Sequence, residues 1–192
     1  MKTPIFQIIL AVFFSLGVIS CNNQGSRDKD NVNDSTAMNS NDNGAMNMDQ
    51  NNDQDFMEEA AYGGLMEVEL GKYAQQTAQN PRVKNFAAMM VKDHSKANDE
   101  LKALAAKKNI TLPAVLDEKH MDKINDVKEK RGADFDKEYI KEMVDDHDKD
   151  VDKFRKQAEN GEDADIKAFA AKTLPVLITH QDSAKSIKDA LK

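Results

Sequence analysis

From Asp53 onward, apolar residues recur at steps of three and four, the spacing that places side chains on one face of an α-helix. The first such face consists of Phe56, Ala60, Gly63, Glu67, Leu70, Ala74 and Thr77. The chain has no Trp and only 3 Tyr, whereas Ala, Lys, Glu and Met are abundant. Such a composition favours helix over sheet. The pattern therefore predicts one all-α domain over residues 53–192.

Turn and capping residues divide this domain into four long helices and one short helix. The expected helices run from Asp53 to about Gln79, from Pro81 to Asn109, from Asp117 to Arg131, from about Asp134 to Gly161, and from Asp163 to the C-terminus. Asn80 followed by Pro81 is typical of an N-cap and a first helical residue. In the last helix, Pro175 is expected to cause a kink.

The lengths of the connections predict how the helices are arranged. Both the first and the last pair of long helices are joined by tight turns, and a long connection with the short helix separates the pairs. This order predicts two antiparallel hairpins joined by a crossover, which is the connectivity of a ferritin-like four-helix bundle. An up-and-down bundle of five helices is the alternative.

The N-terminus has the features of an export signal. Residues 5–19 form an apolar run that is too short to span a bilayer comfortably but suits the core of a signal peptide. Cys21, the one cysteine, follows Val18-Ile19-Ser20, which resembles a bacterial lipobox. We predict a signal peptide over 1–20 and a lipid on Cys21 that anchors the protein to a membrane of the cell envelope. A plain secretory signal with a free cysteine is the alternative.

The residues after the cysteine predict a tether. Asn22 at the following position resembles outer-membrane sorting in enteric bacteria, so we expect the outer membrane as the location. Residues 22–52 are nearly all Asn, Asp, Ser, Gly and Gln and cannot bury enough apolar surface to order themselves. Residues 21–52 are therefore expected to be a lipidated cysteine with a disordered polar tether. The net charge of −7 argues against nucleic acid as a partner.

Each long helix carries one ionisable residue on its apolar face: Glu67, His94, His147 and His180. Glu67 and His94 lie about thirteen and fourteen residues from the first turn, so they share one level of an antiparallel hairpin. His147 and His180 lie about fourteen and eighteen residues from the last turn, and match within about one helical turn. We therefore expect all four side chains to meet in the middle of the bundle.

A carboxylate and three imidazoles suit Zn, Fe or another first-row divalent metal ion. Their burial costs several kcal/mol unless each group has a partner. Asp93 and Asp146, which precede two of the histidines, are candidates to fix the histidine tautomers. The alternative is a hydrogen-bonded buried network from Glu67 to the histidines that binds no metal.

Several short segments of the domain carry a resemblance to a known family. They are Phe56, Gly63-Gly64, Glu67–Lys72, Met90–His94, Phe135-Asp136 with Tyr139, Met143–His147, and Leu174-Pro175 with His180. Together they resemble the DUF4142 family of bacterial envelope proteins of unknown function. The resemblance implies a ferritin-like helical bundle and an envelope location, and it implies no established activity. Val91, Val144 and Leu177 stand three residues before the histidines, where di-iron enzymes of this fold carry glutamate, so di-iron oxidase chemistry is disfavoured.

These observations predict a cell-envelope lipoprotein whose bundle binds a metal ion at Glu67, His94, His147 and His180. The second hypothesis is a non-catalytic structural or interaction module without metal. An enzyme ranks third, because the sequence contains no recognisable nucleophile arrangement or phosphate-binding loop. His120, on the short helix, is expected to be exposed to solvent.

Overall fold

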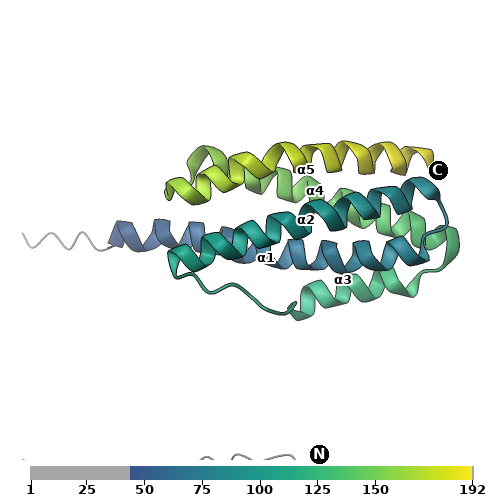
Figure 1. The fold of residues 1–192 in the computed structure, drawn as a ribbon, viewed down its shortest axis with the longest axis horizontal. Helices are drawn as coiled ribbons and strands as arrows, with labels where there is room; N and C mark the ends of the chain where they lie inside the picture. The colour runs from purple at the N-terminus through teal and green to yellow at the C-terminus, as the bar shows by residue number, and fades with distance from the viewer. Residues whose placement is uncertain (1–43, 192) are drawn as a thin grey trace, which may run out of the picture. The chain divides into compact units, whose positions relative to one another are not determined.

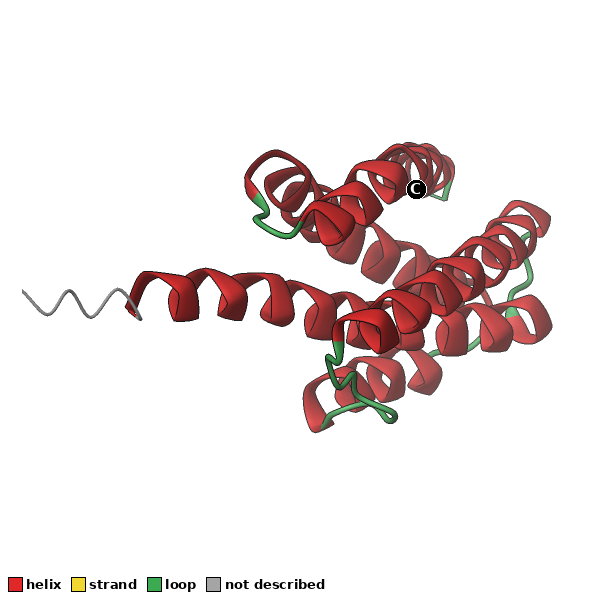
Figure 2. Ribbon diagram, turned by 60° about the vertical axis from the view of Figure 1, so that its left-hand side comes forward, coloured by secondary structure: helices red, strands yellow, loops and turns green. Residues whose placement is uncertain are grey.

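The computed structural model describes residues 44–191, with side chains from residue 52 onward. This part of the chain consists of five helices and contains no strand (Figure 2). The helices are α1 (Gly44–Thr77), α2 (Pro81–Lys108), α3 (Glu118–Glu129), α4 (Gly132–Asn160) and α5 (Ala164–Ala190). The all-α prediction is thus confirmed. The expected signal peptide, Cys21 and residues 22–43 of the expected tether lie outside the described residues.

Capping residues set most of the helix ends, as the sequence predicts. The side chain of Asn80 accepts a hydrogen bond from Arg82 N at 2.8 Å, and Pro81 is the first residue of α2. Asn109 ends α2 in the left-handed conformation, with φ of 55°. Asp117 and Asp163 are the N-caps of α3 and α5. Each cap satisfies backbone groups that have no partner inside the helix.

Two helices begin earlier than expected. α1 starts at Gly44, so residues 44–52, expected in the tether, are helical. These residues include two Met, Ala and Gln and no Pro, and they extend a helix already fixed by the buried Phe56, since adding a residue to a formed helix is easier than nucleating one. α4 starts at Gly132, whose φ of +59° allows the short connection from α3.

The long helices form two hairpins, α1 with α2 and α4 with α5 (Figure 1). Between the hairpins α1 faces α4 and α2 faces α5, and α3 packs on the outside against α1 and α4. The first turns of α1 extend past the other helices in both ribbon views. α5 continues as a helix through Pro175. None of the described helices has the length and hydropathy that a membrane-crossing helix requires.

The core has two apolar clusters along the bundle. The first contains Leu70, Phe86, Phe135, Tyr139 and Ile140, and the second contains Met57, Leu101, Phe154, Ile166 and Leu177, among others. Full burial of such side chains stabilises the fold by about 1.5–3 kcal/mol each. Glu67, His94, His147 and His180 are buried and belong to neither cluster.

Candidate metal centre

The bundle interior contains one carboxylate and three imidazoles, each contributed by a different long helix. Glu67 comes from α1, His94 from α2, His147 from α4 and His180 from α5, and none of them is more than 6% exposed. All four lie on the apolar faces of their helices, which explains why they point inward. The structure therefore brings together the four residues that the sequence singled out.

Glu67 joins two of the histidines through their Nδ1 atoms. Its Oε2 lies 2.8 Å from Nδ1 of His94, and its Oε1 lies 3.4 Å from Nδ1 of His147. When Glu67 is ionised its oxygens only accept, so the short contact then places the His94 proton on Nδ1. The Nε2 atom of His94 is then left without a proton, and this buried atom has no hydrogen-bond partner within the described region.

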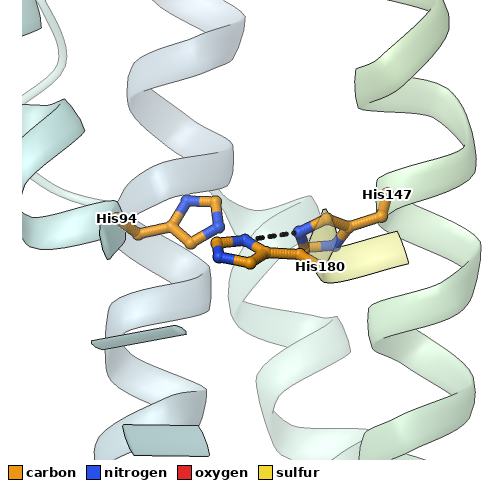
Figure 3. A group of neighbouring side chains, drawn as sticks. All are labelled: His94, His147 and His180. Atoms are coloured by element: carbon orange, nitrogen blue, oxygen red, sulfur yellow. Dashed lines mark hydrogen bonds between the residues drawn. The ribbon is translucent and has the colours of Figure 1, made fainter. Parts of the chain in front are cut away.

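His147 and His180 face each other through Nε2 of His147 and Nδ1 of His180, which lie within hydrogen-bonding distance. Nδ1 of His147 donates to the Met143 carbonyl oxygen at 2.9 Å, and Nε2 of His180 donates to Oδ2 of Asp93 at 3.2 Å. These acceptors hold one proton on each ring, since a neutral imidazole has one N–H. The remaining pair, His147 Nε2 and His180 Nδ1, lies 3.4 Å apart (Figure 3). With the ring protons on His147 Nδ1 and His180 Nε2, both facing nitrogens present lone pairs, which a shared proton or a metal cation between them would satisfy.

The spacing of the rings suits a single metal ion. One ring nitrogen from each of the three histidines lies within 4.8 Å of the other two. Metal–nitrogen bonds of about 2.0–2.1 Å separate the nitrogens of a tetrahedral site by about 3.3 Å. The facing nitrogens of His147 and His180 already have nearly this separation, and Figure 3 shows the His94 ring turned toward the other two.

Burial keeps the imidazoles uncharged. It lowers the pKa of His94, His147 and His180, in the last case to about 4, because the charged form loses its hydration. Burial also raises the pKa of Glu67, and the nearby His147 partly opposes this shift. At neutral pH the three rings are therefore neutral, which is the form that binds metal ions.

The family follows from comparison with known proteins. A sequence model of the DUF4142 family, described as a domain of unknown function, matches residues 37–187. The chain belongs to the DUF4142 family. The resemblance drawn from the short sequence segments is thus confirmed. None of the curated proteins compared with this DUF4142 chain matches it significantly in sequence.

One solved structure similar to this DUF4142 chain is that of CopM in the Cu(II)-bound form. The two superpose with a TM-score of 0.63, over 73% of this chain and 97% of CopM, at 18% sequence identity. At this identity the likeness shows a shared helical fold.

The acids beside the histidines act differently from what the order of residues suggests. In this DUF4142 domain Asp93 contacts His180 on α5 rather than His94, its neighbour in the chain. Asp146 does not contact His147 but pairs with the ammonium of Lys123 on α3. Consecutive residues of a helix point about 100° apart, so a carboxylate reaches the ring on the helix it faces.

The structure adds to the sequence predictions at two further residues, His120 and Asp150. His120 is partly buried, because its ring stacks on Tyr62 with centroids 5.2 Å apart and its Nδ1 lies 2.6 Å from Asp117. Asp150 was not singled out in the sequence; burial, together with the nearby carboxylate of Glu67, raises its pKa to about 7. Its position three residues after His147, on the same face of α4, was the available signal.

Proposed function

We propose that this domain binds one divalent first-row transition metal ion through His94, His147 and His180. The observation that carries the proposal is the convergence of one nitrogen from each of three buried imidazoles, whose second nitrogens all have an acceptor, with Nε2 of His94 lacking any partner in the described part of the chain. A cation bonded to all three rings would give each of these nitrogens a partner.

In this proposal Glu67 and Asp93 orient the ligands. Metal-bound histidines commonly donate their second ring N–H to a carboxylate or a backbone carbonyl, which fixes the tautomer and the ring orientation. All three histidines have such an acceptor: Glu67 for His94, the Met143 carbonyl for His147, and Asp93 for His180. Glu67, expected from the sequence to be a fourth ligand, is thus assigned to the hydrogen bonds that hold the rings.

The donor set favours copper among the candidate ions. Affinity for nitrogen ligands rises along the first-row divalent series to Cu²⁺ and is lower for Zn²⁺ and for Fe²⁺, the two ions expected from the sequence. The Cu(II)-bound form of CopM supports copper binding by a bundle of this shape. The two hairpins with an outer crossover helix also support a ferritin-like arrangement, a fold that builds metal sites from facing helices.

Metal analysis of the full chain tests the proposal. Protein purified without chelator and loaded with Cu²⁺ or Zn²⁺ is expected to retain one ion per chain after desalting. His147→Asn should abolish retention, whereas His120→Asn, which changes the histidine outside the centre, should leave it intact. If the natural chain retains neither ion, the proposal is rejected, and the buried residues form a hydrogen-bonded network in a structural or interaction module.

We further propose that the protein is a lipoprotein of the cell envelope, held by a lipid on Cys21. The apolar run over 5–19 and the lipobox-like residues before Cys21 support this assignment. Cys21→Ser should move the protein from the membrane fraction to the soluble fraction of a bacterial expression host. Retention of that variant in the membrane fraction would contradict lipid anchoring. A metal-binding domain on a membrane tether suits storage or sensing of the ion in the envelope.

A further inference from the structure

The interior of helix α1 contains three glycines, Gly63, Gly64 and Gly71, and only two of them have a packing reason. A Cβ at Gly64 would lie 2.0 Å from Asn98 Oδ1, and one at Gly71 would lie 2.8 Å from Val91 Cγ2, so both glycines allow α2 to approach closely. A Cβ at Gly63 would meet nothing nearer than Asp150 Oδ2, at 3.7 Å. Since glycine weakens a helix interior, its presence at Gly63 calls for another reason. Gly63 lies in the wall of a pocket, which its missing side chain leaves open.

This pocket lies between α1, α3 and α4 and has a volume of about 380 Å³. Its rim includes exposed residues such as Asp55 and Lys149, and its floor includes the buried Glu67 and Asp146. Oε1 of Glu67 and Oδ2 of Asp146 are buried atoms that lack a hydrogen-bond partner in residues 52–191. The walls carry seven carboxylate residues against four lysines, so the pocket attracts cations.

The pocket reaches the histidines through two residues. Glu67 and Asp150 line it, and both also line a small pocket of about 20 Å³ that borders His94. These two carboxylates therefore connect the larger pocket with the surroundings of the His94 ring. Glu67 in turn contacts Nδ1 of both His94 and His147.

Other approaches to the centre are less suitable for an ion. Along the bundle, the two apolar clusters lie on either side of Glu67 and the three histidines and carry no charged side chain to attract a cation. On the α2–α5 face, a surface pocket of about 130 Å³ includes Asp93 and Glu100, but Lys96 and Lys172 balance their charge. The acidic pocket is both larger and connected to the carboxylate that touches two histidines.

We propose that the pocket between α1, α3 and α4 is the entrance by which the metal ion reaches the three histidines, with Asp150 and Glu67 as successive carboxylates along the path. This proposal rests on the proposed metal-binding function. Lys153 is the natural competitor of the entering cation, because its Nζ lies 2.5 Å from Glu59 Oε2 and 4.0 Å from Asp150 Oδ1. In the metal-free protein Lys153 neutralises part of the negative charge of Glu59 and Asp150, and the entering metal ion displaces its ammonium group.

The rate of metal loading tests this entrance separately from binding. Metal-free full-length chain is mixed rapidly with Cu²⁺ at pH 7.5, and the copper–imidazole absorption is followed in the natural protein and in three variants. Asp150→Asn should slow loading by about tenfold or more, because charged clefts raise association rates by about 10- to 1,000-fold. Lys153→Gln should accelerate it. Glu100→Gln, on the opposite face, is the matched control and should load at the natural rate.

The final stoichiometry separates the two proposals. One ion per chain in every protein, with changed rates only for Asp150→Asn and Lys153→Gln, supports the entrance. Equal rates in all four proteins with full loading would overturn the entrance and leave metal binding intact, and slowing by Glu100→Gln alone would place the route on the α2–α5 face. Absence of copper in the natural chain would overturn both proposals. Far-ultraviolet circular dichroism checks folding, and Lys153→Gln decides the matter if Asp150→Asn does not fold.

Discussion

Oδ2 of Asp93 on α2 accepts a hydrogen bond from Nε2 of His180 on α5, at 3.2 Å. The contact joins the two hairpins of the bundle and leaves Nδ1 of His180 free to face His147. Asp93 thus determines which nitrogen of His180 can bind a metal ion. Its described hydrogen bond to a histidine is the one to His180.

Removal of this acceptor should weaken metal binding. In Asp93→Ala, His180 can place its proton on either nitrogen and its ring is no longer held, so Cu²⁺ affinity should fall by about 10- to 100-fold. Asp93→Asn keeps an acceptor oxygen and should lose less. Competition titration against a chelator of known affinity measures the change. Asp99→Ala, which changes an exposed acid on the same helix, is the control, and equal affinities of Asp93→Ala and Asp99→Ala would contradict the assigned role.

Glu67 should matter for the stability of the metal-free fold. Glu67→Ala removes the acceptor of His94 Nδ1 and leaves a buried donor unpaired, which should lower the free energy of unfolding by about 2–4 kcal/mol. Glu67→Gln retains an acceptor oxygen and should cost less. Urea unfolding in the presence of a chelator measures both values. Glu69→Ala, at a half-exposed position paired with Lys128, serves as the comparison, and a similar loss there would show that Glu67 stabilises no buried contact.

The helix ends and the inward direction of Glu67 and the three histidines could be predicted from the sequence because their signals are local. Asn80-Pro81 and Asp163 mark helix starts through groups within three residues, and those starts are found where expected. Glu67 and the three histidines interrupt apolar faces, so their inward direction follows from helical spacing alone.

Partners across the bundle could not be predicted in the same way. The contact of Asp93 with His180 depends on how far α2 is rotated about its axis, which the spacing of apolar residues fixes only roughly. The stack of His120 on Tyr62 depends on where α3 packs against α1, and a weakly apolar short helix does not specify this. The role of Asp150 requires the pocket between three helices, which exists only in the assembled structure.

Asp136 should be a major determinant of stability outside the metal centre. This residue of α4 is buried, and its carboxylate oxygens accept from Gln79 N at 3.0 Å and from Asn80 N at 2.7 Å in the α1–α2 turn. Asp136→Ala leaves both N–H groups without this charged acceptor and should lower the free energy of unfolding by about 2–4 kcal/mol. Thermal unfolding followed by circular dichroism measures it. Asp134→Ala, at an exposed position of the same helix, should change stability by under about 1 kcal/mol. Equal losses of stability in the two variants would show that the hydrogen bonds of Asp136 to the α1–α2 turn do not stabilise the fold.

The depressed pKa of His180 predicts how the stability of the metal-free protein changes with pH. The pKa of His180 is lowered by burial from 6.5 to about 4 in the folded state, so between these values the unfolded chain binds a proton that the folded chain does not. This contribution lowers stability as pH falls from 6.5 toward 4, and His180→Asn lacks it. The stability advantage of the natural chain over His180→Asn should therefore shrink on acidification, by up to about 1.4 kcal/mol per pH unit.

Urea unfolding of both proteins at several pH values between 4 and 7.5, with chelator present, measures this difference. Glu67 has the opposite effect, since its raised pKa lets the folded state hold a proton that the unfolded chain has lost. Because Glu67 is present in both proteins, its contribution largely cancels in the comparison. A pH-independent difference between the two proteins would show that His180 is not held neutral by burial.

The glycines of α1 predict opposite effects of the same substitution. At Gly71 a Cβ would lie 2.8 Å from Val91 Cγ2 and 3.2 Å from the Ala87 carbonyl oxygen, so Gly71→Ala forces α1 and α2 apart and should destabilise the fold by about 1–3 kcal/mol. At Gly63 the nearest atom is at an ordinary contact distance, so Gly63→Ala should gain about 0.5–1 kcal/mol from the higher helix propensity of alanine. Urea unfolding of the two variants measures both signs. Both variants replace glycine by alanine inside one helix. If both changes raise the free energy of unfolding, close contact with α2 does not require glycine at position 71.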